Sequence, residues 1–476
     1  MYEKILDISR RRGIVYPSFE IYGGLSGFID YGPVGSRIKQ NVEDLIRKFY
    51  VIDEGFFEVQ CPTVSPEQVW IASGHVQSFK DHMIECLKCK EPYRADHLIE
   101  EALKRKTEGL GQKELQELIE KEKVVCLKCK GPLSKVYDFN LMFQTSVGPG
   151  TGKVTSYLRP ETAQTTYLAF RRLWEFARKK LPFGVLQIGH SFRNEISPRQ
   201  VMIRLREFNQ AEIQCFVDPD KKETPRFDEI AGMRVKISAK NGAEETTLKK
   251  LVDEKRIKVQ MIAYFLGKSI KLFEAMGIAP ERLQLRQHED TEKAFYSSDT
   301  WDVEYISPSL GRIELVGIAD RTDYDLKAHM ELSKQDMTVN IEGKKFIPHV
   351  VEIAYGIDRP IYCLLESCYQ EDAERAIFKF PKEIAPYTAG IFPLVEKDGL
   401  PEKAREIFNS LRDKGFFVFY DRSGSIGKKY ARADEIGVPY CITVDYDTLK
   451  DNTVTLRERD SKAQQRVKIE EIAGKI

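Results

Sequence analysis

Apolar positions along the first 380 residues follow two periods. From Ile38 to Phe49 they recur every three or four residues, which predicts an amphipathic helix. Short apolar runs bounded by glycine, proline or polar clusters predict strands at residues 56–62, 183–189, 211–217, 313–318 and 350–355. The second and third runs flank roughly 20 residues with a polar tip at 197–200, so they predict a long antiparallel hairpin. The last run leads into a predicted apolar helix at 361–366.

Two strongly charged stretches interrupt this pattern. Residues 97–123 are charged and have a helical pattern, whereas residues 218–255 are rich in lysine and glutamate and are predicted to be solvent-exposed. We therefore place insertions at about 83–135 and about 218–290 within a larger domain of residues 1–380.

A domain boundary is predicted near residues 381–386, which begin and end with proline. Beyond it, predicted strands at 389–394, 416–420, 440–444 and 453–457 alternate with helices at 401–414 and 426–436, and a further helix ends the chain. Alternation of this kind predicts a separate small α/β domain at residues 386–476.

Composition narrows the class of protein. Among 476 residues, 74 lysines and arginines face 73 aspartates and glutamates, which excludes a polybasic protein and leaves nucleic acid to local patches. A hydrophobic content of 42% excludes a mostly disordered chain. No apolar run is long enough to cross a bilayer, and the first residues lack the apolar core of a signal peptide. We therefore expect a soluble cytoplasmic protein without a membrane partner. A Walker phosphate-binding loop is absent from the sequence.

Four of the nine cysteines form two matched CLKCK segments, with Cys86 and Cys89 in one and Cys126 and Cys129 in the other. Paired C-x-x-C segments suit tetrahedral Zn²⁺, and four sulfur ligands would leave no open position, so this zinc would be structural. Two disulfides or four unused thiols are the alternatives. The remaining cysteines lie in apolar segments and are expected to pack in the core: Cys61, Cys215, Cys363, Cys368 and Cys441.

Three short motifs combine arginine with acidic residues: FRNE at 192–195, RLREF at 204–208 and GIDR at 356–359. Taken singly, each is consistent with an exposed ion pair of little energetic value. In this order and spacing they resemble the second and third motifs of class II aminoacyl-tRNA synthetases. The predicted helix after Tyr31 and the strand before Pro62 resemble the first motif, which builds the dimer interface in that family.

Longer segments narrow the resemblance to the dimeric glycyl-tRNA synthetases of the archaeal or eukaryote-like type. The matching segments span nearly the whole chain: 27–35, 73–81, 139–145, 159–164, 192–199, 316–329 and 425–440. The resemblance implies an α/β (α+β) fold, in which an antiparallel sheet flanked by helices carries a zinc-bearing insertion and a C-terminal anticodon-binding domain. It implies a glycine–tRNA ligase, an enzyme that forms carbon–oxygen bonds. Such an enzyme would be a homodimer, would use ATP and Mg²⁺, and would attach glycine to tRNA(Gly).

The resemblance also assigns roles at an ATP site. Arg193 would grip the α-phosphate and the substrate carboxylate, since a planar guanidinium suits bidentate contacts. Glu195 would bind the adenine amino group, and Arg204 the γ-phosphate. The expected catalytic residues are Arg193, Glu195 and Arg359. The expected ATP-binding set is Arg193, Asn194, Glu195, Arg204, Leu205, Phe208, Glu314, Leu315, Gly356 and Arg359.

Within that set, Phe208 and Arg359 would stack on opposite faces of adenine, and Glu314 would coordinate Mg²⁺, which prefers oxygen ligands. The alternative for Phe208 is ordinary core packing.

The resemblance places the glycine site among carboxylates in apolar segments. The expected contacts are Arg94, Glu161, Glu212, Glu352 and Ala354. Buried unpaired carboxylates are costly, so three of them converge favourably only around a cation such as the substrate ammonium. The alternative is that they satisfy structural arginines such as Arg159.

Two positions depart from the family pattern. Ile353-Ala354 stands where the family usually has proline and serine, and Thr165 stands where it has glycine. Glycine specificity is therefore a hypothesis. Because glycine is the smallest substrate, pocket walls can reject every rival by overlap, and we predict no editing domain.

The C-terminal domain resembles the anticodon-binding domain shared by glycyl, threonyl, prolyl and histidyl synthetases. Its expected tRNA contacts are Arg422, Lys428, Lys429 and Arg432, and the alternative is an ordinary solvated helix. Three other functions stay open: a related class II synthetase of the threonyl, prolyl or histidyl type, a non-catalytic synthetase-like paralogue that binds RNA or DNA, and a zinc-dependent RNA-binding module.

Overall fold

The computed structural model describes residues 1–476 except 106, 108–109, 197, 199–200, 240–241, 289–296 and 372–374. Most of the predicted polar tip at 197–200 therefore lies outside the described residues. In the described part, no helix combines the length and the apolar character needed to cross a membrane.

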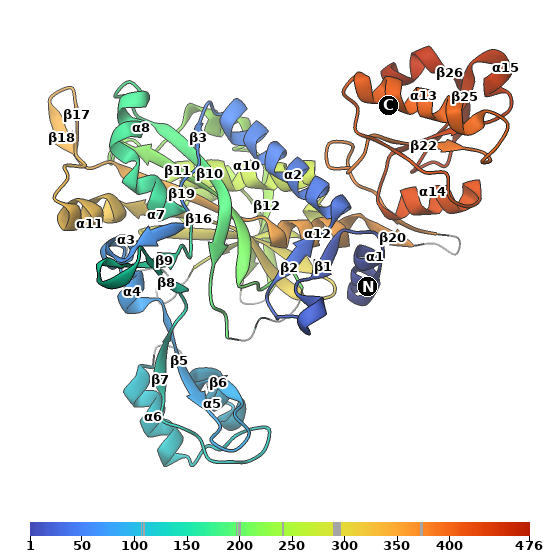
Figure 1. The fold of residues 1–476 in the computed structure, drawn as a ribbon. Coiled ribbons are helices and arrows are strands. Elements are labelled where there is room, and N and C mark those ends of the chain that lie inside the picture. The colour runs from blue at the N-terminus through green and yellow to red at the C-terminus, as the bar shows by residue number, and fades with distance from the viewer. Residues whose placement is uncertain are drawn as a thin grey trace.

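A nine-stranded sheet forms the centre of the molecule (Figure 1). Its order is β13 (Gly242–Thr247), β12 (Arg234–Ala239), β14 (Leu283–Gln287), β15 (Asp299–Ser307), β16 (Gly311–Thr322), β19 (His349–Gly356), β11 (Glu207–Val217), β10 (Phe183–Phe192) and β3 (Phe57–Val59). All neighbours are antiparallel except β12 with β14 and β10 with β3. The expected antiparallel sheet and the long β10–β11 hairpin are confirmed.

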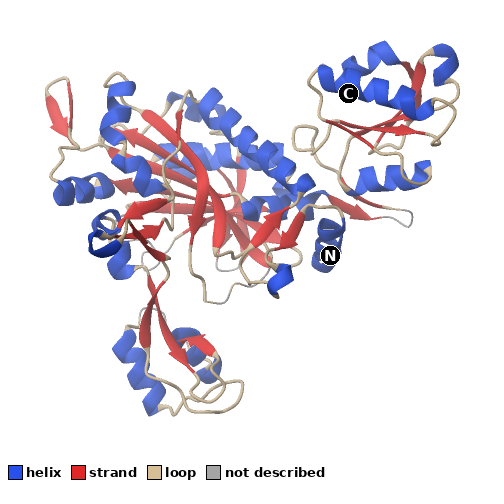
Figure 2. Ribbon diagram, in the orientation of Figure 1, coloured by secondary structure: helices blue, strands red, loops and turns tan. Residues whose placement is uncertain are grey.

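Helices cover both faces of this sheet (Figure 2). On one face, α2 (Pro33–Arg47), α10 (Gln260–Met276) and α12 (Asp358–Cys368) share the largest apolar core with the odd-numbered residues of β11 and β19, such as Ile213 and Ile353. On the other face, α7 (Ala163–Leu168), α8 (Phe170–Phe176) and α11 (Tyr324–Ser333) pack against even-numbered residues such as Phe216 and Val350. Strand alternation thus directs the even-numbered side chains to the second face.

The prediction that residues 218–255 are solvent-exposed is wrong. The apolar side chains of Phe227, Val235, Ile237, Leu248 and Leu251 are buried in the main core. The charged residues of β12 alternate with these apolar ones, so a high charge content concealed a strand with one buried face. The helix α9 (Leu248–Asp253) continues this packed segment.

The predicted charged insertion folds as a small module around its own core (Figure 1). Strands β5 (Lys80–Glu85) and β7 (Tyr137–Asn140) run antiparallel and connect it to the main body, and β6 (Pro92–Arg94) pairs with β5. The two expected helical parts are α5 (Ala95–Leu103) and α6 (Gln112–Lys121).

The C-terminal unit has a five-stranded sheet in the order β23 (Val418–Tyr420), β22 (Ala389–Pro393), β24 (Tyr440–Val444), β25 (Thr453–Glu458) and β26 (Gln464–Lys468). Its helices are α13 (Leu400–Asp413), α14 (Ile426–Glu435) and α15 (Thr448–Asp451). The predicted terminal helix is instead the edge strand β26 followed by a short 3₁₀ helix at Ile469–Gly474. Four of the five residues of this strand are polar or charged, and its single apolar residue, Val467, is buried.

Shorter elements complete the fold. They are α1 (Tyr2–Arg11), β1 (Val15–Pro17), β2 (Ile29–Tyr31), β4 (Val64–Pro66), α3 (Glu67–Ala72), α4 (His75–Ser78), β8 (Gln144–Val147), β9 (Val154–Leu158), β17 (Val339–Ile341), β18 (Lys344–Phe346), β20 (Tyr369–Glu371) and β21 (Ala376–Phe378). A π-helical turn at Lys48–Ile52 extends α2, and 3₁₀ helices lie at Glu20–Tyr22, Gly150–Gly152, Pro225–Glu229 and Pro280–Arg282.

Candidate active site

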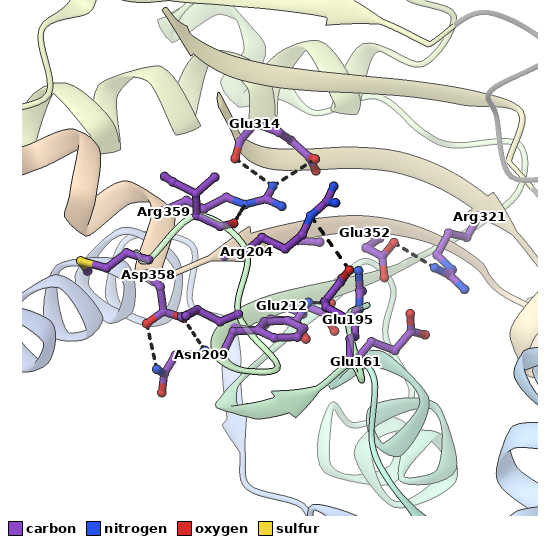
Figure 3. Close-up of a pocket in the computed structure, with 18 residues that line it drawn as sticks. Glu161, Glu195, Arg204, Asn209, Glu212, Glu314, Arg321, Glu352, Asp358 and Arg359 are labelled. Carbon is purple, nitrogen blue, oxygen red and sulfur yellow. Dashed lines mark hydrogen bonds and ion pairs between the residues drawn. The ribbon is translucent and has the colours of Figure 1, made fainter. Parts of the chain in front are cut away.

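A cavity of about 290 Å³ opens on the central sheet, between the β10–β11 hairpin, β16, β19 and the start of α12 (Figure 3). Twelve of the residues expected to bind ATP or the amino acid line it: Glu161, Arg193, Glu195, Arg204, Leu205, Phe208, Glu212, Glu314, Glu352, Ala354, Gly356 and Arg359. Residues far apart in the sequence therefore meet in one site.

One end of the cavity is lined by guanidinium groups. Arg193 donates from Nε to the Pro160 carbonyl at 3.1 Å, and its Cζ lies 5.3 Å from the centre of the Phe208 ring. Arg359 donates from Nη1 to the Glu314 carboxylate at 3.2 Å. The Nε atom of Arg204 lies 4.0 Å from the Glu195 carboxylate. These groups form a cationic region with acidic partners at its rim.

The other end is lined by carboxylates. Because Glu212 and Glu352 occupy even-numbered positions on neighbouring strands, both project from the same face of the sheet. Glu212 accepts hydrogen bonds from the Thr162 hydroxyl at 2.7 Å and from Gln210 Nε2 at 2.9 Å. The third carboxylate, Glu161, precedes α7.

The remaining two carboxylates have different partners. Glu352 accepts from Gln214 Nε2 at 3.1 Å and from Arg321 Nη1 at 3.0 Å. Glu161 accepts from Gln164 Nε2 at 2.9 Å, and His75 Nε2 lies 3.5 Å from its other oxygen.

The carboxylates shift one another's titration. Burial, together with the negative charges of Glu352 and Glu161, raises the pKa of Glu212 to about 8. Burial also raises the pKa of Glu352, although Arg321 opposes it. For Glu161, burial acts in the same direction, but His75, Arg321 and Gln164 together outweigh it and lower its pKa. A cation bound among these three carboxylates would favour their ionised forms.

Arg159 does not satisfy these carboxylates. It is buried, and it donates to the His190 carbonyl at 2.7 Å, to the Cys61 carbonyl at 3.1 Å and to Gln187 Oε1 at 3.1 Å. The arginine that hydrogen-bonds to one of these carboxylates is Arg321, which donates to Glu352 and also pairs with Asp325 at 2.8 Å. Sequence reasoning did not single out Arg321, although it lies inside the matched segment 316–329.

Three expected residues do not line the cavity. Leu315 is buried in the main core. Asn194 donates its backbone N–H to the Leu141 carbonyl at 2.7 Å. Arg94 pairs with Asp96 at 2.6 Å and Asp81 at 3.5 Å at the base of the cysteine-bearing module, and Glu195 adds a weaker effect that raises the pKa of Arg94, after Asp96 and against burial.

Six lining residues were not foreseen: Met202, Ile203, Asn209, Gln210, Arg321 and Asp358. Among them, the buried Oε1 atom of Gln210 has no hydrogen-bond partner in the described part of the chain. An unpaired buried acceptor at the wall of a cavity is a feature that a bound donor would satisfy. Position alone could have suggested Asn209 and Gln210, since they follow Phe208 on the same strand.

The four paired cysteines converge on one point. The Sγ atoms of Cys86 and Cys129 lie 3.5 Å apart, those of Cys89 and Cys126 lie 3.7 Å apart, and all four lie within 4.8 Å of one another. Tetrahedral Zn–S bonds of about 2.3 Å would separate the sulfurs by about 3.8 Å, so the set fits Zn²⁺. All four are free thiols, which excludes the disulfide alternative.

The two CLKCK segments fold into two turns of the same conformation. Lys90 and Lys130 both adopt a left-handed conformation, and their N–H groups donate to the carbonyls of Cys86 and Cys126, each at 2.9 Å. Identical local sequence thus produces two matching knuckles that face each other.

The expected tRNA contacts divide into two groups. Arg422, in the loop before α14, and Lys428, in the first turn of α14, are exposed. Lys429 is fully buried, and its Nζ donates to the Pro393 carbonyl at 2.6 Å, so it cannot face RNA in this conformation. Arg432 pairs with Asp421 at 2.6 Å. Lys428 and Lys429 are adjacent in α14, and one step of helical rotation turns the second side chain inward, which the sequence KK did not reveal.

Comparisons with known proteins cover almost the entire chain. Residues 151–368 match the family model of the tRNA synthetase class II core domain (G, H, P, S and T), and residues 388–476 match that of the anticodon binding domain. A glycine–tRNA ligase of Methanocaldococcus jannaschii is 44% identical over 99% of this chain and 98% of the relative. One of Methanothrix thermoacetophila is 41% identical over 98% and 95%.

The alignment with the Methanocaldococcus protein spans 566 positions, whereas this chain has 476 residues, so the relative carries additional segments. Among solved structures, Giardia lamblia prolyl-tRNA synthetase in complex with prolyl-adenylate has a TM-score of 0.61 at 15% identity. It covers 99% of this chain and 74% of that one. At this identity, the likeness establishes a shared fold.

Proposed function

Because the chain belongs to the family of glycine–tRNA ligases, we propose that its cavity binds ATP and glycine side by side and joins them. A carboxylate oxygen of glycine attacks the α-phosphorus of ATP, the bond to the β-phosphate oxygen breaks, and pyrophosphate leaves. The terminal ribose hydroxyl of tRNA(Gly) then attacks the glycyl carbonyl, and AMP leaves.

One observation carries this proposal: four arginines and five glutamates, drawn from distant parts of the sequence, line a single cavity. The reaction needs no protein nucleophile. It needs two anionic reactants held in line and the developing charge on phosphate stabilised, which positioned guanidinium groups can supply.

Arg193 has the geometry for the reacting phosphate. Its guanidinium makes one hydrogen bond among the described residues, from Nε to Pro160, and this leaves both Nη groups for a ligand. A planar fork can contact a phosphate and a carboxylate at once. Pro160 neighbours Glu161, so this arginine lies between the two ends of the cavity.

The adenine end is formed by Phe208, Arg359 and Glu195. The Phe208 ring offers an apolar face, and Arg359 is held by the Ile203 carbonyl at 3.0 Å and by Glu314. A guanidinium fixed in this way can stack on the opposite face of a base. Arg204 is half-exposed at the rim, where it would hold the γ-phosphate of ATP, which departs as part of pyrophosphate.

Mg²⁺ fits the region around Glu314. This carboxylate lies on β16 directly opposite Glu304 of β15, and it contributes, after burial and against His288, to the raised pKa of Asp302. Glu314 would hold Mg²⁺ through an oxygen ligand, and the bound ion would neutralise phosphate charge.

The carboxylate end is suited to the ammonium of glycine. A cation placed there would favour the ionised form of Glu212, whose pKa burial and its two acidic neighbours raise to about 8. Gln210 offers an acceptor without a partner, and Ala354 contributes only a methyl group to the wall. The unpartnered Gln210 oxygen is therefore a polar contact that the cavity wall can still offer a bound ammonium.

The other open functions receive less support. A related synthetase of the threonyl or prolyl type would share the fold, but the relatives of 40–44% identity are glycine–tRNA ligases. A non-catalytic paralogue or a zinc-dependent RNA-binding module has no need for Arg193, Arg204 and Arg359 around one cavity.

The remaining assignments are part of the proposal. Residues 1–380 form the catalytic domain and 386–476 bind the anticodon. Zn²⁺ is held by Cys86, Cys89, Cys126 and Cys129 as a structural ion. The enzyme is a cytoplasmic homodimer, with an interface at β2, α2 and β3 that light scattering would test.

The test of function is ATP–pyrophosphate exchange with each amino acid in turn. We expect exchange that depends on glycine and is lost in Glu161→Gln. Exchange that depends on serine, threonine or alanine instead would contradict the glycine assignment. If no amino acid supports exchange, the assignment as an enzyme would be contradicted. The matched control is Glu331→Gln, which alters an exposed glutamate of α11 away from the cavity.

A further inference from the structure

A buried carboxylate that was not assigned a role lies in the wall of the cavity. Asp358 is 3% exposed and accepts three hydrogen bonds. Figure 3 shows it beside Asn209. The Tyr31 hydroxyl donates to Oδ1 at 2.6 Å, Asn209 Nδ2 donates to Oδ1 at 3.0 Å, and the Asn209 backbone N–H donates to Oδ2 at 2.7 Å. Both carboxylate oxygens are therefore used.

This carboxylate joins three elements that meet at the nucleotide end of the cavity. Asn209 follows Phe208 on β11, Asp358 precedes Arg359 in α12, and Tyr31 ends β2 just before α2. A fourth hydrogen bond, from the Ile357 N–H to the Asn209 carbonyl at 2.8 Å, reinforces the junction. The residues on either side of adenine in the proposed function are thus the direct neighbours of a single hydrogen-bonded cluster.

Hydrogen bonds to the two carboxylate oxygens hold the cluster together. In the described part of the chain it contains no ion pair. The neighbouring Arg359 points to Ile203 and Glu314. Burial raises the pKa of Asp358, and the donors Tyr31 and Asn209 oppose this shift. Burial, together with the Asp358 charge, raises the pKa of Tyr31 well above its usual value, so its hydroxyl keeps the proton that it donates.

The cluster also separates two cavities. Asp358 lines the cavity described above, Tyr31 lines a neighbouring one of about 770 Å³, and Asn209 lines both. Among the described residues, the Tyr31 hydroxyl hydrogen-bonds to the nucleotide end through Asp358. Removal of the Tyr31 hydroxyl would therefore affect ATP binding through the Asp358 carboxylate and not through a direct contact with ATP.

Resting on the proposed function, we propose that Asp358 and Tyr31 are positioning residues for ATP: the carboxylate sets the spacing of Phe208 and Arg359, and the Tyr31 hydroxyl fixes the carboxylate. The β2–α2 segment is in this way part of the nucleotide site, although it does not line it.

The test compares Tyr31→Phe and Asp358→Asn with Tyr355→Phe. Tyr355 is a matched control because its hydroxyl is also buried and bonded, to Tyr50 at 2.5 Å and Ser269 at 2.6 Å, yet its side chain lies in the core. Calorimetric titration with ATP alone measures affinity without turnover. We expect Tyr31→Phe to weaken ATP binding about fivefold through loss of one charge-assisted hydrogen bond.

Asp358→Asn should weaken ATP binding more, by about tenfold or greater, because its amide nitrogen must face at least one of the three donors. In pyrophosphate exchange, both variants should raise KM for ATP and leave KM for glycine within about twofold. A merely structural role would affect both substrates, or the amount of folded enzyme. Thermal unfolding reports on folding, and Tyr31→Phe, which removes one hydroxyl, keeps the test open if Asp358→Asn does not fold.

ATP affinities equal to that of Tyr355→Phe in both variants would overturn the inference, and so would a wild-type protein that does not bind ATP. Failure of the proposed function is distinguishable: wild-type protein would then bind ATP in the calorimeter but show no glycine-dependent exchange. The calorimetric comparison would still decide the role of Asp358 and Tyr31.

Discussion

At the scale of single residues, burial and neighbouring charge change the titration of Glu212 strongly. It is 3% exposed, and burial and two neighbouring carboxylates raise its pKa to about 8. An unfolded glutamate titrates near about 4.3. The folded protein therefore retains a proton that the unfolded chain releases, and this contribution to stability is complete below about pH 4.3 and is lost as pH rises through about 8.

Glu212→Gln should remove this dependence. Between pH 5 and pH 8, the free energy of unfolding of the ligand-free variant should rise relative to wild type by on the order of 2 kcal/mol. Urea unfolding at the two pH values measures it, with the exposed Glu331→Gln as control. A difference that does not change with pH would mean that Glu212 is ionised in the ligand-free protein.

Individual site residues differed in how far the sequence could reveal them. Glu161, Glu212 and Glu352 stand out because each carboxylate interrupts an apolar segment. Arg321 and Asp358 are as closely involved, but their roles depend on which strands become neighbours. The opposite error occurs at Lys429, where a basic residue expected to face RNA is directed inward by one step of helical rotation.

At the scale of elements, the cysteine knuckles require a small residue next to the four thiols. A Cβ atom on Gly131 would lie 2.8 Å from Lys88 Cβ, 3.1 Å from Cys129 Sγ and 3.2 Å from Cys86 Sγ. These contacts are closer than side chains tolerate, and the atoms in question belong to both knuckles. The glycine therefore allows the two turns to approach each other.

Gly131→Ala should displace a thiolate and weaken zinc binding by about 10-fold to 100-fold, the range typical of perturbed ligand orientation. Competition with a chelator, read by a zinc-sensitive dye, measures this. Gly111→Ala in the same module is the control, since its added Cβ would be 3.6 Å from the nearest atom, in the Glu114 side chain. Equal retention of zinc in both variants would argue against a metal at the four cysteines.

Elements with a clear period were predicted well, and those with mixed signals were not. The helix α2 and the β10–β11 hairpin follow from apolar spacing alone. The prediction for residues 218–255 failed because charged and apolar residues alternate there. Arg234 and Lys236 lie on either side of the buried Val235, and Lys236 is followed by the buried Ile237, so a strand with one buried face has the composition of a solvated loop. Its burial depends on α10 and β14, which come later in the chain.

At the scale of the whole molecule, the two large units share contacts that bear on how tRNA binding should be tested. Arg375 pairs with Asp434 at 2.5 Å, and Arg12 pairs with Glu435, both at the end of α14. Ile436 and Val438 belong to the same apolar core as Phe380. Deleting residues 386–476 would expose that core, so loss of activity would not report on RNA binding alone.

Substitutions in the loop before α14 and in its first turn avoid this difficulty. The double variant Arg422→Ala with Lys428→Ala should reduce glycylation of tRNA by about tenfold, mainly through KM for tRNA, since two phosphate contacts account for a loss of this size at physiological salt. ATP–pyrophosphate exchange, which needs no tRNA, should be unchanged. Lys450→Ala, an exposed lysine of α15 in the same unit, is the control. If the double variant charges tRNA like the control at low and high salt, then this helix is an ordinary solvated surface, and the anticodon must meet another face of the C-terminal sheet.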